Sequence, residues 1–306
     1  GWAGMGYDQA LLSLGQVKGQ QVGIGFALST PVIYYNADLM RKAGVEPDRF
    51  PMNWDAIMNA AKKSKAATPG TESLHVEWDI SGNWMWQALV FSNGGTMLTA
   101  DEKKVAFDGP AGKAAMLTLE QLVKQGEMRN ISYSAALQDF VSGKLAVLAT
   151  TTARLGSITK QVGGKFEIRT ARMPVAKDGR LPAGGNAAMM FSKDPAKQAA
   201  AWEYIKFATG PLGATTMVKA TGYFPANTLP ATDPNLLAPF YKANPNHLTA
   251  IAQMPVLTGT YAFPGDNGFK ITDVIKDHLQ TVVSQEVQPA VALSEMSKAV
   301  QALLPR

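Results

Sequence analysis

Strand-like and helical segments alternate along all 306 residues of the chain. Apolar, β-branched runs at 22–27 and 31–35 are separated by Ser29 and Thr30, and helical segments follow them. This alternation predicts an α/β fold, with helices layered on sheets, rather than a helical bundle or a β-sandwich. A chain of this length with 46% hydrophobic residues can bury two cores of ordinary size. We therefore expect two α/β domains.

The helix boundaries are marked by capping residues, prolines and glycines. Asn36 is the expected N-cap of a helix at 37–43 that Gly44 closes, and Asn53 is the expected N-cap of the next helix. A proline in the first turn marks several later helices. The pattern predicts such helices at 110–126, 195–210 and 289–304, with a further one that starts at Pro211. Another helix is expected at 271–283.

Composition excludes several classes of function. The net charge is +5, and the basic residues are scattered singly or in pairs, so no nucleic-acid partner is predicted. The absence of cysteine excludes disulfides, cysteine nucleophiles and thiolate zinc sites. We expect His75, His247 and His278, which are far apart in the sequence, at the surface rather than on a metal. The sequence therefore predicts no cofactor and no metal site.

Hydropathy gives no sign of a membrane segment. No run of about eighteen apolar residues is present, and residues 1–20 lack the basic start and apolar centre of an export signal. The chain is expected to be a globular protein in water.

Three tryptophans lie within nine residues, at Trp78, Trp84 and Trp86, interleaved with Asp79 and other polar residues. A sugar or polyol presents hydroxyls and apolar C–H faces, so its receptor needs polar partners beside flat rings. Trp84 is the preferred stacking residue. Trp86 and Asp79 are further candidates for ligand contact, although Trp78 and Trp86 also suit a packed core.

Other candidates lie where apolar segments break. A hydroxyl of Ser29 or Thr30 can face a cleft, or the pair can satisfy its own backbone in a turn. Gly184 and Gly185 permit close approach of the backbone to a ligand, or supply a positive φ. Arg154 follows an apolar strand and can bind a carboxylate, a phosphate or two sugar hydroxyls, or can be a solvated arginine at a helix start.

The order of several motifs resembles that of family 1 extracellular solute-binding proteins, and within them the glycerol-3-phosphate-binding branch. The stretch 26–36, followed by Asp38-Leu39 and 42–44, is similar to the hinge-strand signature of that family. Further segments match in the same order along the chain. They are the helix start at 51–57, the tryptophan-rich turn and helix at 82–95, the segment 140–146 before a buried strand, the glycine-rich crossing at 184–186 and the turn at 221–225.

The resemblance implies a periplasmic binding protein-like type II fold, with two lobes joined by hinge strands. It assigns residues 1–30 and 186–226 to the N-terminal lobe, and 31–185 and 227–306 to the C-terminal lobe. The stretch 225–255 is the least regular, and is either a crossing between lobes or a surface loop. The hinge signature appears by residue 26, where the family has two or three strand-helix units before it, so the first lobe is expected to be incomplete through loss of a segment.

By the same resemblance the chain is the substrate-binding component of an ABC importer, periplasmic or extracellular, monomeric, with a membrane permease as partner. The pairs Ser29-Thr30 and Gly184-Gly185 match positions that contact ligand in the family, and Tyr223 looks like its ligand tyrosine. Thr272 stands where the branch has a phosphate-binding arginine, and Lys270 lies nearby. A neutral sugar or polyol is therefore the expected ligand, with a phosphoester as the alternative.

An enzyme is the competing class, because a glycosidase also combines carboxylates with a sugar site. Glu77 and Asp79 are the one close acidic pair among aromatic residues, and their spacing would place both on one strand face. No nucleophile elbow, phosphate-binding loop or zinc-protease motif accompanies them. We expect a receptor without catalytic activity, and a structural or signalling remnant is a third possibility.

Overall fold

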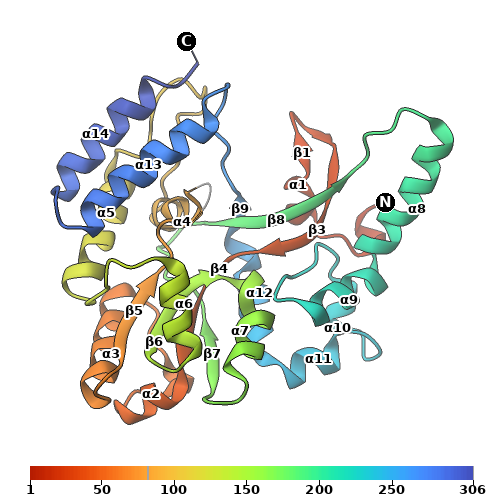
Figure 1. The fold of residues 1–306 in the computed structure, drawn as a ribbon. Helices are drawn as coiled ribbons and strands as arrows, with labels where there is room; N and C mark the ends of the chain where they lie inside the picture. Colours follow the sequence, from red (N-terminus) through yellow and green to blue (C-terminus); the bar gives the residue numbers. More distant parts are fainter. Residues whose placement is uncertain (81–82, 306) are drawn as a thin grey trace. The chain divides into compact units, whose positions relative to one another are not determined.

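The computed structural model describes residues 1–80 and 83–305. The chain folds into two compact units (Figure 1). Unit 1 comprises Gly1–Thr30, Thr151–Lys160 and Ala183–Gly259. Unit 2 comprises Pro31–Thr150, Gln161–Pro182 and Thr260–Arg306. No helix within the described residues is both long enough and apolar enough to cross a membrane.

These bounds differ from the predicted lobes at three places. Residues 151–160, 183–185 and 227–259, which the sequence placed with the C-terminal lobe, belong to unit 1. Long-range contacts explain the difference. The backbone of Thr152 pairs with that of Thr30. Leu237 and Ala250 pack into clusters with residues of the strand that ends at Ser29. Such contacts leave no local signal in the sequence.

Unit 1 is built on a three-stranded sheet with helices around it. The sheet has the order β3-β8-β9, and β3 and β8 are antiparallel. Its strands are β3 (Gly23–Ser29), β8 (Leu181–Met189, whose first residues belong to unit 2) and β9 (Leu257–Gly259). A separate two-stranded ribbon joins β1 (Gln16–Val17) to β2 (Gln20–Gln21). The helices are α1 (Gln9–Ser13), α7 (Leu155–Val162, which runs on into unit 2), α8 (Pro195–Thr209), α9 (Pro211–Ala220), α10 (Leu229–Thr232), α11 (Ala238–Ala243) and α12 (Leu248–Gln253).

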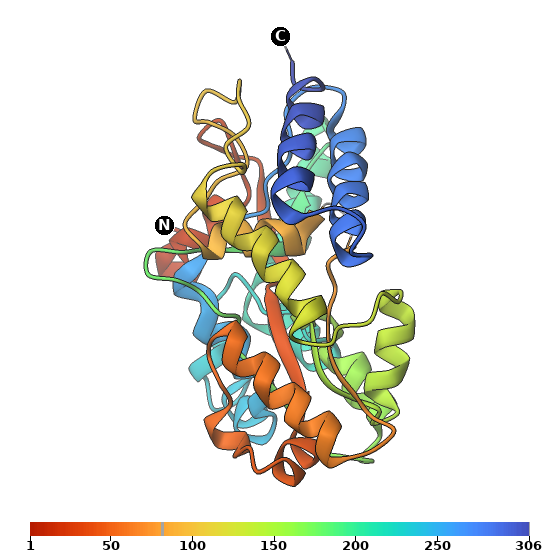
Figure 2. The same ribbon diagram turned by 90° about the vertical axis from the view of Figure 1, so that its left-hand side faces the viewer.

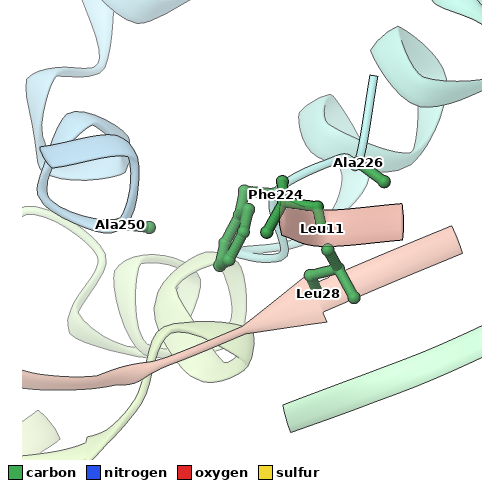
Figure 3. Close-up of a cluster of buried hydrophobic side chains, with 5 residues drawn as sticks. All are labelled: Leu11, Leu28, Phe224, Ala226 and Ala250. Carbon is green, nitrogen blue, oxygen red and sulfur yellow. The ribbon is translucent and has the colours of Figure 1, made fainter. Parts of the chain in front are cut away.

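Apolar side chains from distant segments form the core of unit 1. Figure 3 shows Phe224 beside Leu11 and Leu28, with Ala226 and Ala250 in the same cluster. The backbone of Phe224 exchanges two hydrogen bonds with Leu28, at 2.8 and 2.9 Å. The segment at 221–226 is therefore fixed against β3 by both its backbone and its side chains.

Unit 2 contains a four-stranded mixed sheet of order β5-β6-β4-β7. β5 and β6 are parallel, whereas β4 and β7 are antiparallel. The strands are β4 (Pro31–Asn36), β5 (Glu72–Val76), β6 (Leu145–Thr151, ending at the unit boundary) and β7 (Ile168–Ala171). Every residue of β4 and β6 is buried, as expected for inner strands of a sheet covered on both faces.

Helices cover this sheet and extend the core of unit 2. α3 lies against β5, and α13 and α14 lie side by side in both views (Figures 1 and 2). The helices are α2 (Ala37–Lys42), α3 (Trp54–Ala67), α4 (Trp84–Ser92), α5 (Pro110–Lys124), α6 (Tyr133–Val141), α13 (Gly268–Val283) and α14 (Pro289–Gln301).

The capping residues predicted from the sequence act as predicted. The Asn36 side chain accepts a hydrogen bond from the Leu39 amide at 3.0 Å, and Asn53 caps α3 in the same way at 2.9 Å. Asp194 accepts from two amides at the start of α8. Each cap satisfies amides that would otherwise lack a partner at the helix start. The predicted helices at 271–283 and 289–304 are also present, the second ending at Gln301.

Candidate functional site

The predicted ligand residues fall into two groups, one in each unit. Ser29, Thr30, Arg154, Gly184, Gly185 and Tyr223 belong to unit 1, and Asp79, Trp84 and Trp86 belong to unit 2. Each group is described within its own unit.

Thr30 lies at the end of β3 and is held by three hydrogen bonds. Its amide donates to the Thr152 hydroxyl at 3.1 Å, and its carbonyl accepts from the Thr152 amide at 3.0 Å. The side-chain amide of Gln253 donates to the Thr30 hydroxyl at 3.2 Å. Thr30 is fully buried and Ser29, paired with Gly184 in the sheet, is 4% exposed. The break between the two apolar strands is thus a rigid, hydrogen-bonded junction.

The turn at 221–223 packs directly on the segment that carries Arg154. A Cβ added to Gly222 would lie 1.9 Å from the Thr152 carbonyl oxygen and 2.8 Å from the Leu155 amide. The Tyr223 amide donates to the Thr221 hydroxyl at 3.1 Å, and the half-buried Tyr223 ring packs against an apolar cluster that includes Ala27 and Val218. Arg154 and Tyr223 therefore stand on two turns in contact with each other.

The two glycines of β8 differ in what their positions require. Gly185 has φ +113°, and a Cβ there would lie 2.0 Å from the Ala27 carbonyl oxygen. The pairing of β3 with β8 shifts register between Gly25 and Ala27, and this bulge is what brings the two backbones so close. Strand geometry alone thus accounts for Gly185. That Gly184 and Gly185 present an amide to ligand stays a prediction.

The tryptophan-rich segment of unit 2 is buried and contains polar atoms without partners. Trp78, Trp84 and Trp86 are 5%, 6% and 1% exposed. Trp86 packs edge-on against Phe107, with the ring centroids 6.0 Å apart. The indole Nε1 atoms of all three, together with Asp79 Oδ1 and Asn83 Oδ1, are buried without a hydrogen-bond partner among the described residues. Buried polar groups normally have partners, so this segment is set apart from an ordinary core.

Residues 261–272 of unit 2 are hydrogen-bonded to the tryptophan-rich segment. The Asn83 side-chain amide donates to the Thr272 carbonyl at 2.8 Å. Gln87 of α4 forms two hydrogen bonds with the backbone of Tyr261, each 2.9 Å long. The start of α13, where Thr272 and the exposed Lys270 lie, is thus joined to the tryptophan-rich segment. Residues 81–82, which precede Asn83 in the predicted turn, lie outside the described residues.

The predicted geometry of the acidic pair is wrong. β5 ends at Val76, and Trp78 and Asp79 form a turn, so Glu77 and Asp79 do not share a strand face. The buried Glu77 carboxylate accepts a hydrogen bond from the Thr150 hydroxyl on the neighbouring strand. Glu77 is therefore engaged in joining the ends of β5 and β6, which is a structural task.

The prediction that the histidines lie at the surface is wrong for His75, which is 1% exposed in β5. Neither ring nitrogen has a hydrogen-bond partner among the described residues. Burial, and secondarily the positive charge of Arg129, lower the pKa of His75 to about 4. No cluster of three or more histidine and acidic residues suited to a metal occurs in the described chain.

Several residues that shape these groups were not identified from the sequence. Thr152 and Gln253 hold Thr30, and Gly222 allows the contact of two turns. The predicted turn motif contained Gly222, but neither Thr152 nor Gln253 carries a local signal. Asn83 stood among the polar residues between the tryptophans, and its positive φ of 55° marks it as unusual only in three dimensions.

Comparison with known proteins identifies the family to which this chain belongs and proteins that are similar to it. Residues 2–249 match the model of the family described as bacterial extracellular solute-binding protein. The chain is 26% identical over 294 residues to the sn-glycerol-3-phosphate-binding periplasmic protein UgpB of Escherichia coli K12, covering 92% of this chain and 66% of that protein. The corresponding protein of Rhizobium meliloti is 25% identical over 289 residues, covering 90% and 66%.

Solved structures of the same type superimpose on nearly the whole chain. UgpB from Mycobacterium tuberculosis, in complex with glycerophosphocholine, has a TM-score of 0.82 at 21% identity and covers 99% of this chain and 77% of its own. The cyclic alpha-maltosyl-1,6-maltose binding protein from Arthrobacter globiformis has a TM-score of 0.80 at 25% identity and covers 97% and 76%.

The architecture is therefore that of the two-lobed α/β proteins of type II that bind solutes, as the sequence predicted. The chain belongs to the family of bacterial extracellular solute-binding proteins. It spans 66% of the length of the curated relatives that it matches.

Proposed function

We propose that this chain captures a small hydroxylated ligand as the substrate-binding component of an ABC importer. The observation that carries the proposal is the set of buried polar atoms without protein partners in the tryptophan-rich segment of unit 2. Three indole N–H donors and the acceptors Asp79 Oδ1 and Asn83 Oδ1 are buried without a partner among the described residues. A hydroxyl both donates and accepts, so a sugar or polyol matches such a mixed set, and the indole faces suit its C–H groups.

Unit 1 supplies a different set of contacts. Tyr223 offers a ring and a hydroxyl on a turn fixed against β3, and Arg154 offers an exposed guanidinium on the neighbouring turn. Ser29, Thr30, Gly184 and Gly185 provide the rigid backbone from which these turns project, with room for a backbone contact at the exposed Gly185. In this proposal each unit contributes its own set of ligand-binding residues.

Closure about the connecting segments is the proposed mechanism. The chain passes between the units at Thr30, Thr150, Lys160, Pro182 and Gly259. Two rigid bodies joined by short segments can rotate, and ligand stabilises the closed form by its differential affinity alone. A micromolar ligand supplies about 8 kcal/mol in total. If most of that affinity belongs to the closed form, it exceeds the roughly 5.5 kcal/mol that inverts a 1:99 population. The permease would then recognise the closed form.

The names of relatives agree with a ligand of this kind. They are described as binding sn-glycerol 3-phosphate, glycerophosphocholine and a cyclic maltosyl-maltose, all of which carry several hydroxyls or phosphoester oxygens. Thr272 offers Asn83 a carbonyl oxygen, and no guanidinium stands at that position. A neutral sugar or polyol is favoured at unit 2, and a phosphoester is the alternative ligand.

We further propose a periplasmic or extracellular location, a monomeric state and no catalytic activity. The family description and the periplasmic relatives support the location. The engagement of Glu77 by Thr150 argues against a glycosidase that uses Glu77 and Asp79, because the pair is not free to flank a scissile bond.

A thermal-shift screen of sugars, polyols and glycerol phosphoesters, followed by calorimetry, tests the proposal. Trp84→Phe replaces the indole with a phenyl ring, so an aromatic face remains but the N–H donor is lost. Tyr223→Ala removes the aromatic ring and the hydroxyl that unit 1 offers. Each should weaken a ligand found in the screen by about tenfold, the value of one to two lost hydrogen bonds. Tyr204→Ala is the control, because Tyr204 is 69% exposed on α8 of unit 1.

Two results would contradict the proposal. Unchanged affinity in both variants would remove the assigned residues from the site, and a hydrolysed product of the bound sugar would make the protein an enzyme. Wild-type ligand should be recovered intact after prolonged incubation, as judged by mass spectrometry.

A further inference from the structure

Arg154 occupies a fixed position at the end of a buried strand. β6 ends at Thr151, whose hydroxyl accepts a hydrogen bond from the Ala153 amide at 3.1 Å, and a single 3-10 turn at Thr152–Arg154 leads into α7. The Ser157 hydroxyl donates to the Arg154 carbonyl at 3.0 Å. The backbone of this turn is therefore rigid, while the Arg154 side chain is exposed.

Two other segments of unit 1 lock the same turn from either side. Thr152 exchanges hydrogen bonds with Thr30 at the end of β3, at 3.0 and 3.1 Å. On the other side the Thr152 carbonyl lies so close to Gly222 that no Cβ fits there. The guanidinium of Arg154 and the phenol of Tyr223 thus arise from neighbouring turns that cannot move apart without breaking this packing.

Unit 1 also carries most of the net positive charge of the protein. Its segments contain eight Lys and Arg against four Asp and Glu, while the whole chain has a net charge of +5. The four carboxylates each take part in a local contact. Asp8 caps α1, Asp194 caps α8, Glu203 pairs with Lys206, and Asp233 accepts from the Asn235 amide.

Thr272 of unit 2 stands where the resemblance to the family implies a phosphate-binding arginine, and its surroundings are unsuited to an anion. The Thr272 carbonyl accepts from the Asn83 side-chain amide, and the tryptophan-rich segment contains the buried Asp79 Oδ1, which has no hydrogen-bond partner among the described residues. Oxygen atoms with negative charge repel an anionic group. An anionic group on the ligand would therefore be disfavoured at unit 2.

We propose that Arg154 is a specificity-determining residue, whose planar guanidinium binds an anionic oxygen group, a carboxylate or a phosphate, on the hydroxylated ligand. The Tyr223 hydroxyl donates to the same group. This assignment rests on the proposed capture of a solute. It takes the anionic alternative for the ligand over the neutral one and adds that unit 1 receives the charge. Arginine suits the task because its donors match two oxygens of a carboxylate or phosphate at once.

Matched ligand pairs that differ only in charge test the assignment by calorimetry on the full chain. The probes are sn-glycerol 3-phosphate against glycerol, and glucuronate against glucose, so that the two arms separate a phosphate from a carboxylate. Wild-type protein should bind the anionic member of at least one pair about ten- to a hundredfold more tightly, as expected for a charge-assisted pair of hydrogen bonds. Arg154→Gln should abolish this preference, so that the anionic and neutral members of a pair bind within about twofold of each other.

Two control variants separate a specific contact from general electrostatics. Lys160→Gln removes one positive charge from the exposed side of α7 and should leave the preference intact. Arg154→Lys keeps the positive charge but loses the planar guanidinium that donates to two oxygens at once. It should retain only part of the preference for the anionic ligand. Equal loss in Lys160→Gln and Arg154→Gln would overturn the assignment.

The outcomes distinguish this assignment from the proposed function. A wild-type preference for the neutral members, or a preference for an anion that survives in Arg154→Gln, overturns the role of Arg154 while solute capture stands. Absence of binding to both members of both pairs, and to the whole ligand screen, overturns solute capture and the role of Arg154 together.

Discussion

His75 should make unit 2 sensitive to mild acid. Its imidazole is buried in β5 opposite Leu148, without a hydrogen-bond partner among the described residues, and burial lowers its pKa from 6.5 to about 4. The unfolded chain binds a proton below about pH 6.5, whereas the folded protein resists protonation down to about pH 4. The stability contributed by neutral His75 is therefore fully present above pH 6.5 and is lost as the pH falls towards 4.

The size of the effect follows from the two pKa values. At about pH 5 the unfolded histidine is almost fully protonated while the folded one is mostly neutral, which lowers the free energy of unfolding by about 2 kcal/mol relative to pH 7.5. Replacing His75 with leucine, which is similar in volume and cannot be protonated, should remove this part of the acid sensitivity. At about pH 7.5 the variant should be as stable as wild type within about 1.5 kcal/mol, because leucine leaves no polar atom unsatisfied.

Urea unfolding at the two pH values measures the effect. Tryptophan fluorescence reports mainly on unit 2, which contains four of the six tryptophans, namely Trp54, Trp78, Trp84 and Trp86. His247 lies in unit 1 and its pKa is also lowered to about 4 by burial, so an acid shift of unit 1 should persist in the variant and serve as an internal control. An equal loss of stability in unit 2 of wild type and His75→Leu would refute the reasoning.

Three further predictions concern stability and use chemical denaturation as the measurement. Gly222→Ala should cost about 2 to 4 kcal/mol because its Cβ meets the Thr152 carbonyl at 1.9 Å, whereas Gly268→Ala, with its nearest neighbour at 3.5 Å, should change stability by no more than about 1 kcal/mol. Equal effects of the two would contradict the packing of the 221–223 turn. Gly185→Ala should cost about 3 kcal/mol or more, since it combines a φ of +113° with a Cβ 2.0 Å from a backbone oxygen, and a stable variant would show that the bulge can relax. Asn36→Ala should cost about 1 kcal/mol by removing the cap of α2, and no change would mean that water replaces the cap at no cost.

Local chemistry carried most of the prediction of secondary structure. The caps at Asn36 and Asn53 act over three residues, so the residues that make the bond are visible together in the sequence. Buried strands such as β4 and β6 appear as continuous apolar runs for the same local reason. The family and the type of fold followed from the order of such segments, and the comparisons confirmed them.

The candidate site was predictable only in part. The tryptophan-rich segment was identified by its residue types, and the turn at 221–225 by its resemblance to a motif of the family. Their surroundings were not, because they depend on partners brought in by folding. The sequence placed Glu77 beside Asp79 on a strand, but the strand ends one residue earlier and Thr150 takes the carboxylate.

The sequence by itself determined the elements of this protein and their order, since propensity, capping and apolar periodicity act over a few residues. The family was indicated by the resemblance of its motifs. Tertiary structure decided the environment of each candidate residue. Thr30 is held by Thr152, 122 residues away, and by Gln253, 223 residues away. Contacts over such separations are set by how the sheets and their helices pack. For this reason no single stretch of sequence predicts the burial of His75, the assignment of residues 151–160 to unit 1, or the fixed turn that carries Arg154.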